Sequence, residues 1–402
     1  MASSLPPPSQ QSGPYARPIG NQRQAQRGFR ADIERFWQRV TEGLALNQLW
    51  FQFRQEARTS FQLYRRDFPR GSAREQWKQR GTFDFLQELA WAFLGKLSPA
   101  RRVLLLIGTV LLMLPNGGFQ FQEGHRDVQL VWGDPHFWGG VLLFGLLMLE
   151  VADRVVMKRD LEIARDIQSW LLPSAPPNVP GLAIAFATRP ANTVAGDFYD
   201  VFPRIQASSS ETHFLIAVAD VAGKSIPAAL LMATFQASLK TLSSTPCSLL
   251  ELVAGMNRYA CNNSQGGLRF TTAFLAEYNP GTRAVTYVNA GHNNPILRRS
   301  SGAIERLETG GLPLGIQPDA AYSVGEVSLA PGDWLAIFTD GLVEAENASA
   351  QEYGEERLLT TIQMGGHLAP EALLQQMISN VNNFVGTTPQ HDDVTCVLIK
   401  AI

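Results

Sequence analysis

Four short acidic segments in the C-terminal part of the chain carry the residues best suited to chemistry. They are Ala195–Asp200, Asp220–Lys224, Phe338–Gly341 and His391–Thr395. Each places a carboxylate next to a predicted strand end or a glycine-containing turn. Oxygen-only ligands gathered from distant segments suit a hard divalent cation such as Mg2+ or Mn2+. The pattern therefore predicts a metal site that assists hydrolysis.

A carboxylate beside a glycine often only forms a turn, and for Asp220 alone that structural interpretation would be preferred. The repetition of the pattern favours ligands. Asp340 follows a second strand of the same kind, and Asp392 directly precedes a third. Carboxylates that are buried close together repel one another, and this is costly unless a cation neutralises them.

Beyond Gly181 the sequence changes to short β-rich runs. The predicted strands are Leu182–Ala187, Phe214–Ala219, Thr271–Ala276, Val285–Val288, Trp334–Phe338 and Val394–Ile399. The predicted helices are Pro227–Leu242, Ser248–Ser264 and Pro370–Val385. Strands grouped together, with the helices outside them, favour an α+β fold over an alternating βαβ fold.

The order of these motifs, together with Asn289–Asn293, Leu312–Gly315 and Thr339–Ala345, resembles the metal-dependent protein phosphatase (PPM, protein phosphatase 2C) family. The bacterial branch that acts on regulators of sigma factors is the most similar, and the resemblance runs from about Leu161 to Ile402. It implies a two-sheet antiparallel β-sandwich flanked by helices. It also implies two divalent cations, Mn2+ or Mg2+, between the sheets at one edge.

The resemblance assigns roles to individual residues. Asp220 and Asp197 are the implied catalytic residues, and Asp220 is expected to bridge the two cations. Either Asp392 or Asp393 could point toward the metals, and we prefer Asp392 because the resemblance places the ligand three residues before Thr395. The implied metal ligands are Asp197, Asp220, Val221 through its carbonyl, Asp340, Asp392 and Asp393.

Four further positions near these motifs have more than one interpretation. His292 could act as a general acid, but a hydrogen-bonding structural role is favoured for a His beside Gly and Asn. Asp200 could simply accept hydrogen bonds from the following loop. Ala195 and Ser225 stand where this branch of the family usually has Gly, and we expect altered loop conformation there rather than loss of the metal.

Charge divides the chain into two parts. The net charge is −2, but residues 1–100 contain 15 Lys and Arg against 8 Asp and Glu, and the remainder contains 19 against 28. Residues 1–28 are predicted to be a disordered tail, and 29–100 a basic amphipathic helical region. The three cysteines are too few and too far apart for a disulfide framework, so we expect them to be reduced.

Residues 101–149 contain two apolar runs, Val103–Leu114 and Phe137–Leu149. Each is shorter than the roughly 20 residues of a membrane-spanning helix, although the flanking residues can extend both. Basic residues outside the pair and acidic residues between the runs predict a hairpin in the cell inner membrane, with both termini and the catalytic domain cytoplasmic. A soluble or re-entrant helical pair is the alternative.

Residues 150–172 lack Gly and Pro and carry two adjacent apolar stripes, which need a partner, either the phosphatase domain or a second copy of this helix. We predict a regulatory linker helix that pairs with its copy in a homodimer and packs against the first catalytic strands. The phosphatase domain is then 173–402. The expected partners are a phosphorylated protein, such as an anti-anti-sigma-type regulator, and the lipid membrane. A catalytically weak docking module is the alternative function. Nucleic-acid binding is not expected, because it would leave the acidic segments without a role.

Overall fold

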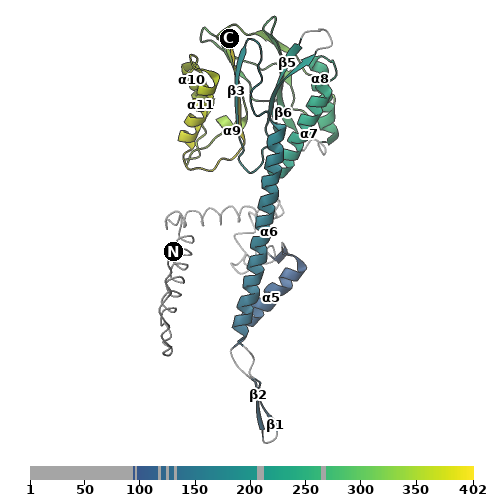
Figure 1. Cartoon of the computed structure of the whole chain (residues 1–402), viewed down its shortest axis with the longest axis vertical. Helices are drawn as coiled ribbons and strands as arrows, with labels where there is room; N and C mark the ends of the chain where they lie inside the picture. The colour runs from purple at the N-terminus through teal and green to yellow at the C-terminus, as the bar shows by residue number, and fades with distance from the viewer. Residues whose placement is uncertain are drawn as a thin grey trace, which may run out of the picture. The chain divides into compact units, whose positions relative to one another are not determined.

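The computed structural model describes residues 94–95, 97–115, 119–123, 126–130, 134–205, 212–263 and 269–402 (Figure 1). The chain divides into two compact units, one up to Leu146 and one from Leu147. The predicted tail of residues 1–28 lies outside the described residues, as does nearly all of the predicted basic region 29–100.

The described elements of the first unit are two helices and a hairpin. They are α5 (Pro99–Met113), β1 (Phe119–Glu123), β2 (Arg126–Leu130) and the first part of α6 (Pro135–Leu171). Two glycines allow α5 and α6 to approach closely. A Cβ added at Gly108 would lie 2.9 Å from Leu143 Cδ2, and one at Gly139 would lie 2.9 Å from the Gly108 carbonyl oxygen. Small residues at a helix contact permit such packing because they let the backbones come together.

The predicted membrane hairpin is not supported by the described helices, none of which combines the length and the apolar character needed to cross a membrane. Helix α5 has 15 residues. Helix α6 has 37 residues and runs without a break through the boundary predicted between residues 149 and 150. The second apolar run and the linker helix are therefore one element, because no Gly or Pro between Leu146 and Leu171 interrupts the helical hydrogen bonds.

Two β-sheets form the body of the second unit. The six-stranded sheet has the order β10-β7-β6-β5-β4 with β11 also on β7, and the five-stranded sheet has the order β3-β13-β12-β8-β9. The first contains β4 (Phe198–Ile205), β5 (Thr212–Val221), β6 (Thr271–Asn279), β7 (Ala284–Ala290), β10 (Gly310–Gly311) and β11 (Gly325–Ser328). The second contains β3 (Leu182–Arg189), β8 (Ile296–Arg298), β9 (Ile304–Arg306), β12 (Trp334–Phe338) and β13 (Val394–Ala401).

One strand pair departs from the predicted antiparallel sandwich. Strand β10 pairs with β7 in parallel, whereas the other pairs in these two sheets are antiparallel. A parallel pair needs a long connection, and the segment that includes β8 and β9 supplies it. Glycine is required at this contact, because a Cβ at Gly310 would lie 1.8 Å from the Asn289 carbonyl oxygen.

Helices cover the outer face of each sheet, as Figure 1 shows. They are α7 (Ser225–Ser243), α8 (Leu249–Asn263), α9 (Asp340–Val343), α10 (Glu355–Met364) and α11 (Pro370–Val385). The side chains of β5 alternate between two buried layers: Leu215 and Ala217 pack with α7 and α8, while Ile216 and Val218 pack between the sheets. Because both faces are buried, β5 is a continuous apolar run. The predicted α+β fold with two sheets flanked by helices is confirmed.

A buried ion pair joins the six-stranded sheet to the connection between α7 and α8. The guanidinium of Arg204 on β4 contacts the carboxylate of Glu277 on β6, and both side chains are only 1% exposed. Arg204 Nη2 also donates a hydrogen bond of 2.7 Å to the carbonyl oxygen of Cys247. The pair therefore fixes where the α7–α8 connection lies on the sheet.

Replacing Arg204 with Met should lower the free energy of unfolding by about 3–5 kcal/mol, because the buried Glu277 carboxylate would lose the neutralising charge of the Arg204 guanidinium. The double replacement Arg204→Met with Glu277→Leu should cost much less, since it removes both charges together. Urea unfolding of the three proteins measures this. Equal losses for the single and double variants would show that packing, not charge, dominates at this position.

Candidate functional site

Strand pairing brings the predicted acidic segments to one end of the two sheets. Asp197 directly precedes β4, and the β4–β5 register, extended by one residue pair, places it opposite Asp220. In the other sheet, Asp340 lies just after β12, and Asp392 lies just before β13. Strands β12 and β13 pair with each other, so these two acidic positions also lie at the same sheet end.

Asp197 connects the two sheets. Its side chain is buried, and its Oδ2 accepts a 2.9 Å hydrogen bond from Thr339 Oγ1. Thr339 is itself fully buried, and its hydroxyl oxygen accepts a 2.9 Å hydrogen bond from the backbone N–H of Thr395. Burial, followed by repulsion from the Asp220 carboxylate, raises the pKa of Asp197 well above its usual value.

Asp220 and Asp340 lie within the same electrostatic cluster. Burial, followed by repulsion from Asp340 and then from Asp392, raises the pKa of Asp220 to about 7. Burial also raises the pKa of Asp340, and the Asp392 carboxylate adds to this increase. The structure thus brings together carboxylates from four separate segments.

The two adjacent residues Asp392 and Asp393 make different contacts. Asp393 Oδ1 accepts the N–H of Ala191 at 2.7 Å, and its Oδ2 accepts the N–H of Gly196 at 2.6 Å. Its carboxylate therefore holds the loop before Asp197. Asp392 Oδ2 instead lies 2.9 Å from Lys224 Nζ. These contacts favour Asp392 over Asp393 as the residue that faces the cluster.

The carbonyl of Val221, the other predicted ligand atom, lies at the end of β5. A Cβ added at Gly196 would be only 3.2 Å from this oxygen, so the loop before Asp197 packs closely against it. The side chain of Val221 is buried in the layer between the sheet and α7 and α8. Only its backbone oxygen is therefore available for binding at this edge.

The donor chemistry fits a hard divalent cation, because the cluster offers carboxylate and carbonyl oxygens whose mutual repulsion a cation would relieve. Within the described part of the chain, however, no set of three or more His, Cys, Asp or Glu side chains is arranged so that it could hold a metal ion. The carboxylate and carbonyl oxygens lie in one region, but the side chains of the described residues are not arranged in the coordination geometry of a metal ion.

Lys224 is a site residue to which the sequence assigned no role. Its ammonium group contacts Asp392 and also donates a 2.6 Å hydrogen bond to the His391 carbonyl oxygen. The side chain is 53% exposed, so it can also meet an incoming ligand. Its position directly after Gly223 in an acidic motif is the only sequence signal that could have indicated this role.

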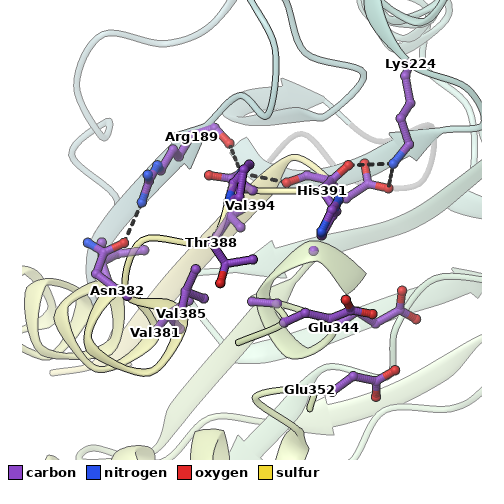
Figure 2. Close-up of a pocket in the computed structure, with 18 residues that line it drawn as sticks. Arg189, Lys224, Glu344, Glu352, Val381, Asn382, Val385, Thr388, His391 and Val394 are labelled. Carbon is purple, nitrogen blue, oxygen red and sulfur yellow. Dashed lines mark hydrogen bonds and ion pairs between the residues drawn. The ribbon is translucent and has the colours of Figure 1, made fainter. Parts of the chain in front are cut away.

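A cavity of about 200 Å³ opens beside Asp392 and Lys224 (Figure 2). Arg189 lines it from β3, and Arg189 Nη1 donates a 2.5 Å hydrogen bond to Asn382 Oδ1 of α11. Glu344, which follows α9, lines the cavity as well. Burial, followed by repulsion from nearby acidic side chains, raises the pKa of Glu344.

Three other positions that the sequence singled out have a structural explanation. His292 is buried with its Nδ1 3.0 Å from Thr272 Oγ1, and burial lowers its pKa to about 4, so it is a neutral hydrogen-bonding residue. Asp200 Oδ2 lies 2.6 Å from Lys240 Nζ on α7, away from the acidic cluster. Ser225 has a φ of 63°, a left-handed conformation that costs a residue with a Cβ about 1 kcal/mol and explains why Gly is common there.

Comparisons with known proteins agree with this arrangement. A family model described as Stage II sporulation protein E (SpoIIE) matches residues 210–402. Phosphoserine phosphatase RsbU of Bacillus subtilis is 30% identical over 250 residues, which are 61% of this chain and 70% of RsbU. Protein IcfG of Synechocystis sp. is 26% identical over 307 residues, or 69% of this chain. The chain spans about half of IcfG, 47% of its length.

A solved structure, the SiaA-PP2C domain of Pseudomonas aeruginosa, shares the fold. The TM-score is 0.52 at 20% sequence identity, and the match covers 62% of this chain and 99% of that domain. The RsbU match extends over most of RsbU, and the SpoIIE match includes Asp220, Asp340 and Asp392. The chain therefore belongs to the family of PP2C-type serine phosphatases that includes SpoIIE and RsbU.

Proposed function

We propose that this chain is a metal-dependent phosphatase that hydrolyses phosphoserine or phosphothreonine on a signalling protein. The observation that carries the proposal is the cluster of carboxylates from four segments, in which burial and then mutual repulsion raise the pKa values of Asp197, Asp220 and Asp340. Similarity to RsbU, a phosphoserine phosphatase, supports serine as the modified residue. A regulator of the anti-anti-sigma type is the substrate class that the family resemblance favours.

Two divalent cations, Mn2+ or Mg2+, are the proposed cofactors. When bound, such a pair lowers the pKa of a coordinated water and neutralises charge on a phosphoryl group. The residues proposed to hold them are Asp197, Asp220 and the carbonyl of Val221 for the first, and Asp220, Asp340 and Asp392 for the second. Asp393 is proposed to hold the loop instead, since two backbone N–H groups occupy its carboxylate.

The remaining residues of the site would orient the ligands and the substrate. The Thr339 hydroxyl fixes one oxygen of Asp197. Lys224 supplies positive charge at the mouth of the cavity, where it could attract phosphoryl oxygens. The cavity between Arg189 and Glu344 has room for a side chain of the substrate next to the phosphorylated residue.

A docking module with little catalysis is the second candidate. The exposed ammonium group of Lys224, beside Asp392 at the cavity, could bind a phosphoryl group without hydrolysis. Metal-dependent phosphate release separates the two functions, because a docking module would bind a phosphoprotein without hydrolysing it.

We also propose that α6 pairs with its copy in a homodimer. Its apolar side chains Ile163 and Ile167 are each 49% exposed, and Trp170 is 79% exposed. Such a stripe is unfavourable in water unless a partner covers it.

Attachment to the cell inner membrane with cytoplasmic termini is a separate proposal, supported by the charge pattern of the sequence.

Replacing Asp220 with Asn should reduce Mn2+-dependent turnover by at least about a hundredfold, because it removes charge between the two proposed cation positions. Phosphate release from a phosphorylated anti-anti-sigma-type protein by the full-length chain measures this. Asp319→Asn, at an exposed loop position, is the matched control and should retain turnover. Wild-type hydrolysis that persists in excess EDTA would contradict the metal mechanism.

In the presence of a chelator, the free energy of unfolding should fall as the pH rises from about 4 to about 7. The raised pKa of Asp220 means that the folded state holds its proton more tightly than the unfolded state does. Deprotonation therefore destabilises the fold across this range. Asp220→Asn should show a smaller fall, measured by urea unfolding at several pH values. A wild-type protein that gains stability over the same range would contradict the repulsion between the carboxylates.

Replacing Ile163 and Ile167 with Asp should convert the proposed dimer to a monomer, since two charges would be placed in the apolar contact. Sedimentation equilibrium of the full-length protein in detergent measures this. Arg165→Asp, on an exposed polar position of the same helix, is the control and should leave the dimer intact. An unchanged mass for the double variant would show that α6 is not the dimer contact.

A further inference from the structure

The last turns of α6 contain one buried side chain. Gln168 is 7% exposed, whereas its neighbours Ile167, Ser169 and Trp170 are exposed. A buried amide requires hydrogen-bond partners for both its oxygen and its nitrogen. Gln168 finds both on one residue: its Nε2 donates to the Ala195 carbonyl oxygen at 2.7 Å, and its Oε1 accepts the Ala195 N–H at 3.0 Å.

The residue that Gln168 binds is two positions before a proposed metal ligand. Residues 195–197 come before β4 begins, so no strand pairing fixes them. Contacts from three different parts of the fold hold them instead. The α6 amide holds the first residue, Asp393 Oδ2 accepts the N–H of Gly196, and Thr339 Oγ1 donates to Asp197.

A second glutamine provides a comparison within the same region. Gln236 on α7 donates a 2.6 Å hydrogen bond from Nε2 to the carbonyl oxygen of Leu171, at the end of α6. This contact holds the helix end against α7 but does not touch residues 195–197. The two glutamines therefore have different contacts. Gln168 binds the segment that contains the proposed metal ligand, whereas Gln236 holds the end of α6 against α7.

We propose that Gln168 is a positioning residue for Asp197, and that it makes the metal affinity of the site depend on how the last turn of α6 is seated. The inference rests on the proposed function, because it assigns Asp197 to the metal. The neutral amide of Gln168 pairs with both the backbone N–H and the backbone carbonyl of Ala195, as the backbone of a neighbouring strand would. Removing it leaves two buried backbone groups without partners directly beside the ligand segment.

The test compares full-length wild type, Gln168→Leu and Gln236→Leu. Mn2+ binding is measured without substrate by isothermal titration calorimetry, and thermal unfolding is recorded with and without Mn2+. Gln168→Leu should weaken Mn2+ binding by at least about tenfold, as loss of a group that orients a ligand does. Gln236→Leu should leave Mn2+ binding unchanged even where it lowers the melting temperature. At saturating Mn2+, Gln168→Leu should recover most of the wild-type turnover.

Gln168→Glu is the second variant in case the Leu variant does not fold. It retains the acceptor for the Ala195 N–H but loses the donor to its carbonyl, and it should also weaken Mn2+ binding. Wild-type Mn2+ affinity in either folded Gln168 variant, or equal weakening by Gln236→Leu, would overturn the positioning role while leaving the proposed function intact. Failure of the wild-type protein to bind Mn2+ would instead overturn the proposed function, and this inference with it.

Discussion

Repulsion among carboxylates where the two sheets meet is the constraint on which the rest of the site depends. The fold relieves part of this repulsion with hydrogen bonds and with the ammonium group of Lys224. Thr339 donates to Asp197, two backbone N–H groups donate to Asp393, and Lys224 contacts Asp392. These contacts do not cancel the repulsion, since burial and neighbouring charge still raise several pKa values. A site with this excess of negative charge favours cations, whatever further role each residue has.

The sandwich makes this concentration of charge possible because both faces of each sheet are packed with apolar side chains. Apolar side chains fill the space between the sheets, and helices bury the outer face of each sheet. The strand ends are therefore held in place by packing that does not involve the acidic residues. The short segment before β4 is different, because hydrogen bonds from separate elements position it. We propose that control of the site is exerted through this segment, which the Gln168 amide of α6 contacts directly.

Prediction from the sequence succeeded where a local pattern reports burial. The central strands and the longer helices α7, α8 and α11 were found from apolar runs and turn residues. Strand β4 was not predicted, because it contains Asp200 and Pro203 and its first residues were interpreted as part of the acidic segment Ala195–Asp200. The short strands β8 to β11 have two to four residues each, too few for a periodic signal. The boundary predicted between residues 149 and 150 lies inside α6, because apolar character changes there without any helix-breaking residue.

The sequence by itself determined which residue types are available, namely acids at strand ends and glycines beside them. It also provided a domain long enough to bring these residues together. Only the tertiary structure decided how neighbouring acids divide their roles, with Asp393 bound to a loop 202 residues earlier in the chain and Asp392 left to face Lys224. It also decided that Gln168 binds Ala195, 27 residues away. Periodicity reports which face of an element is buried, whereas a side-chain hydrogen bond depends on which distant backbone group folding places beside it.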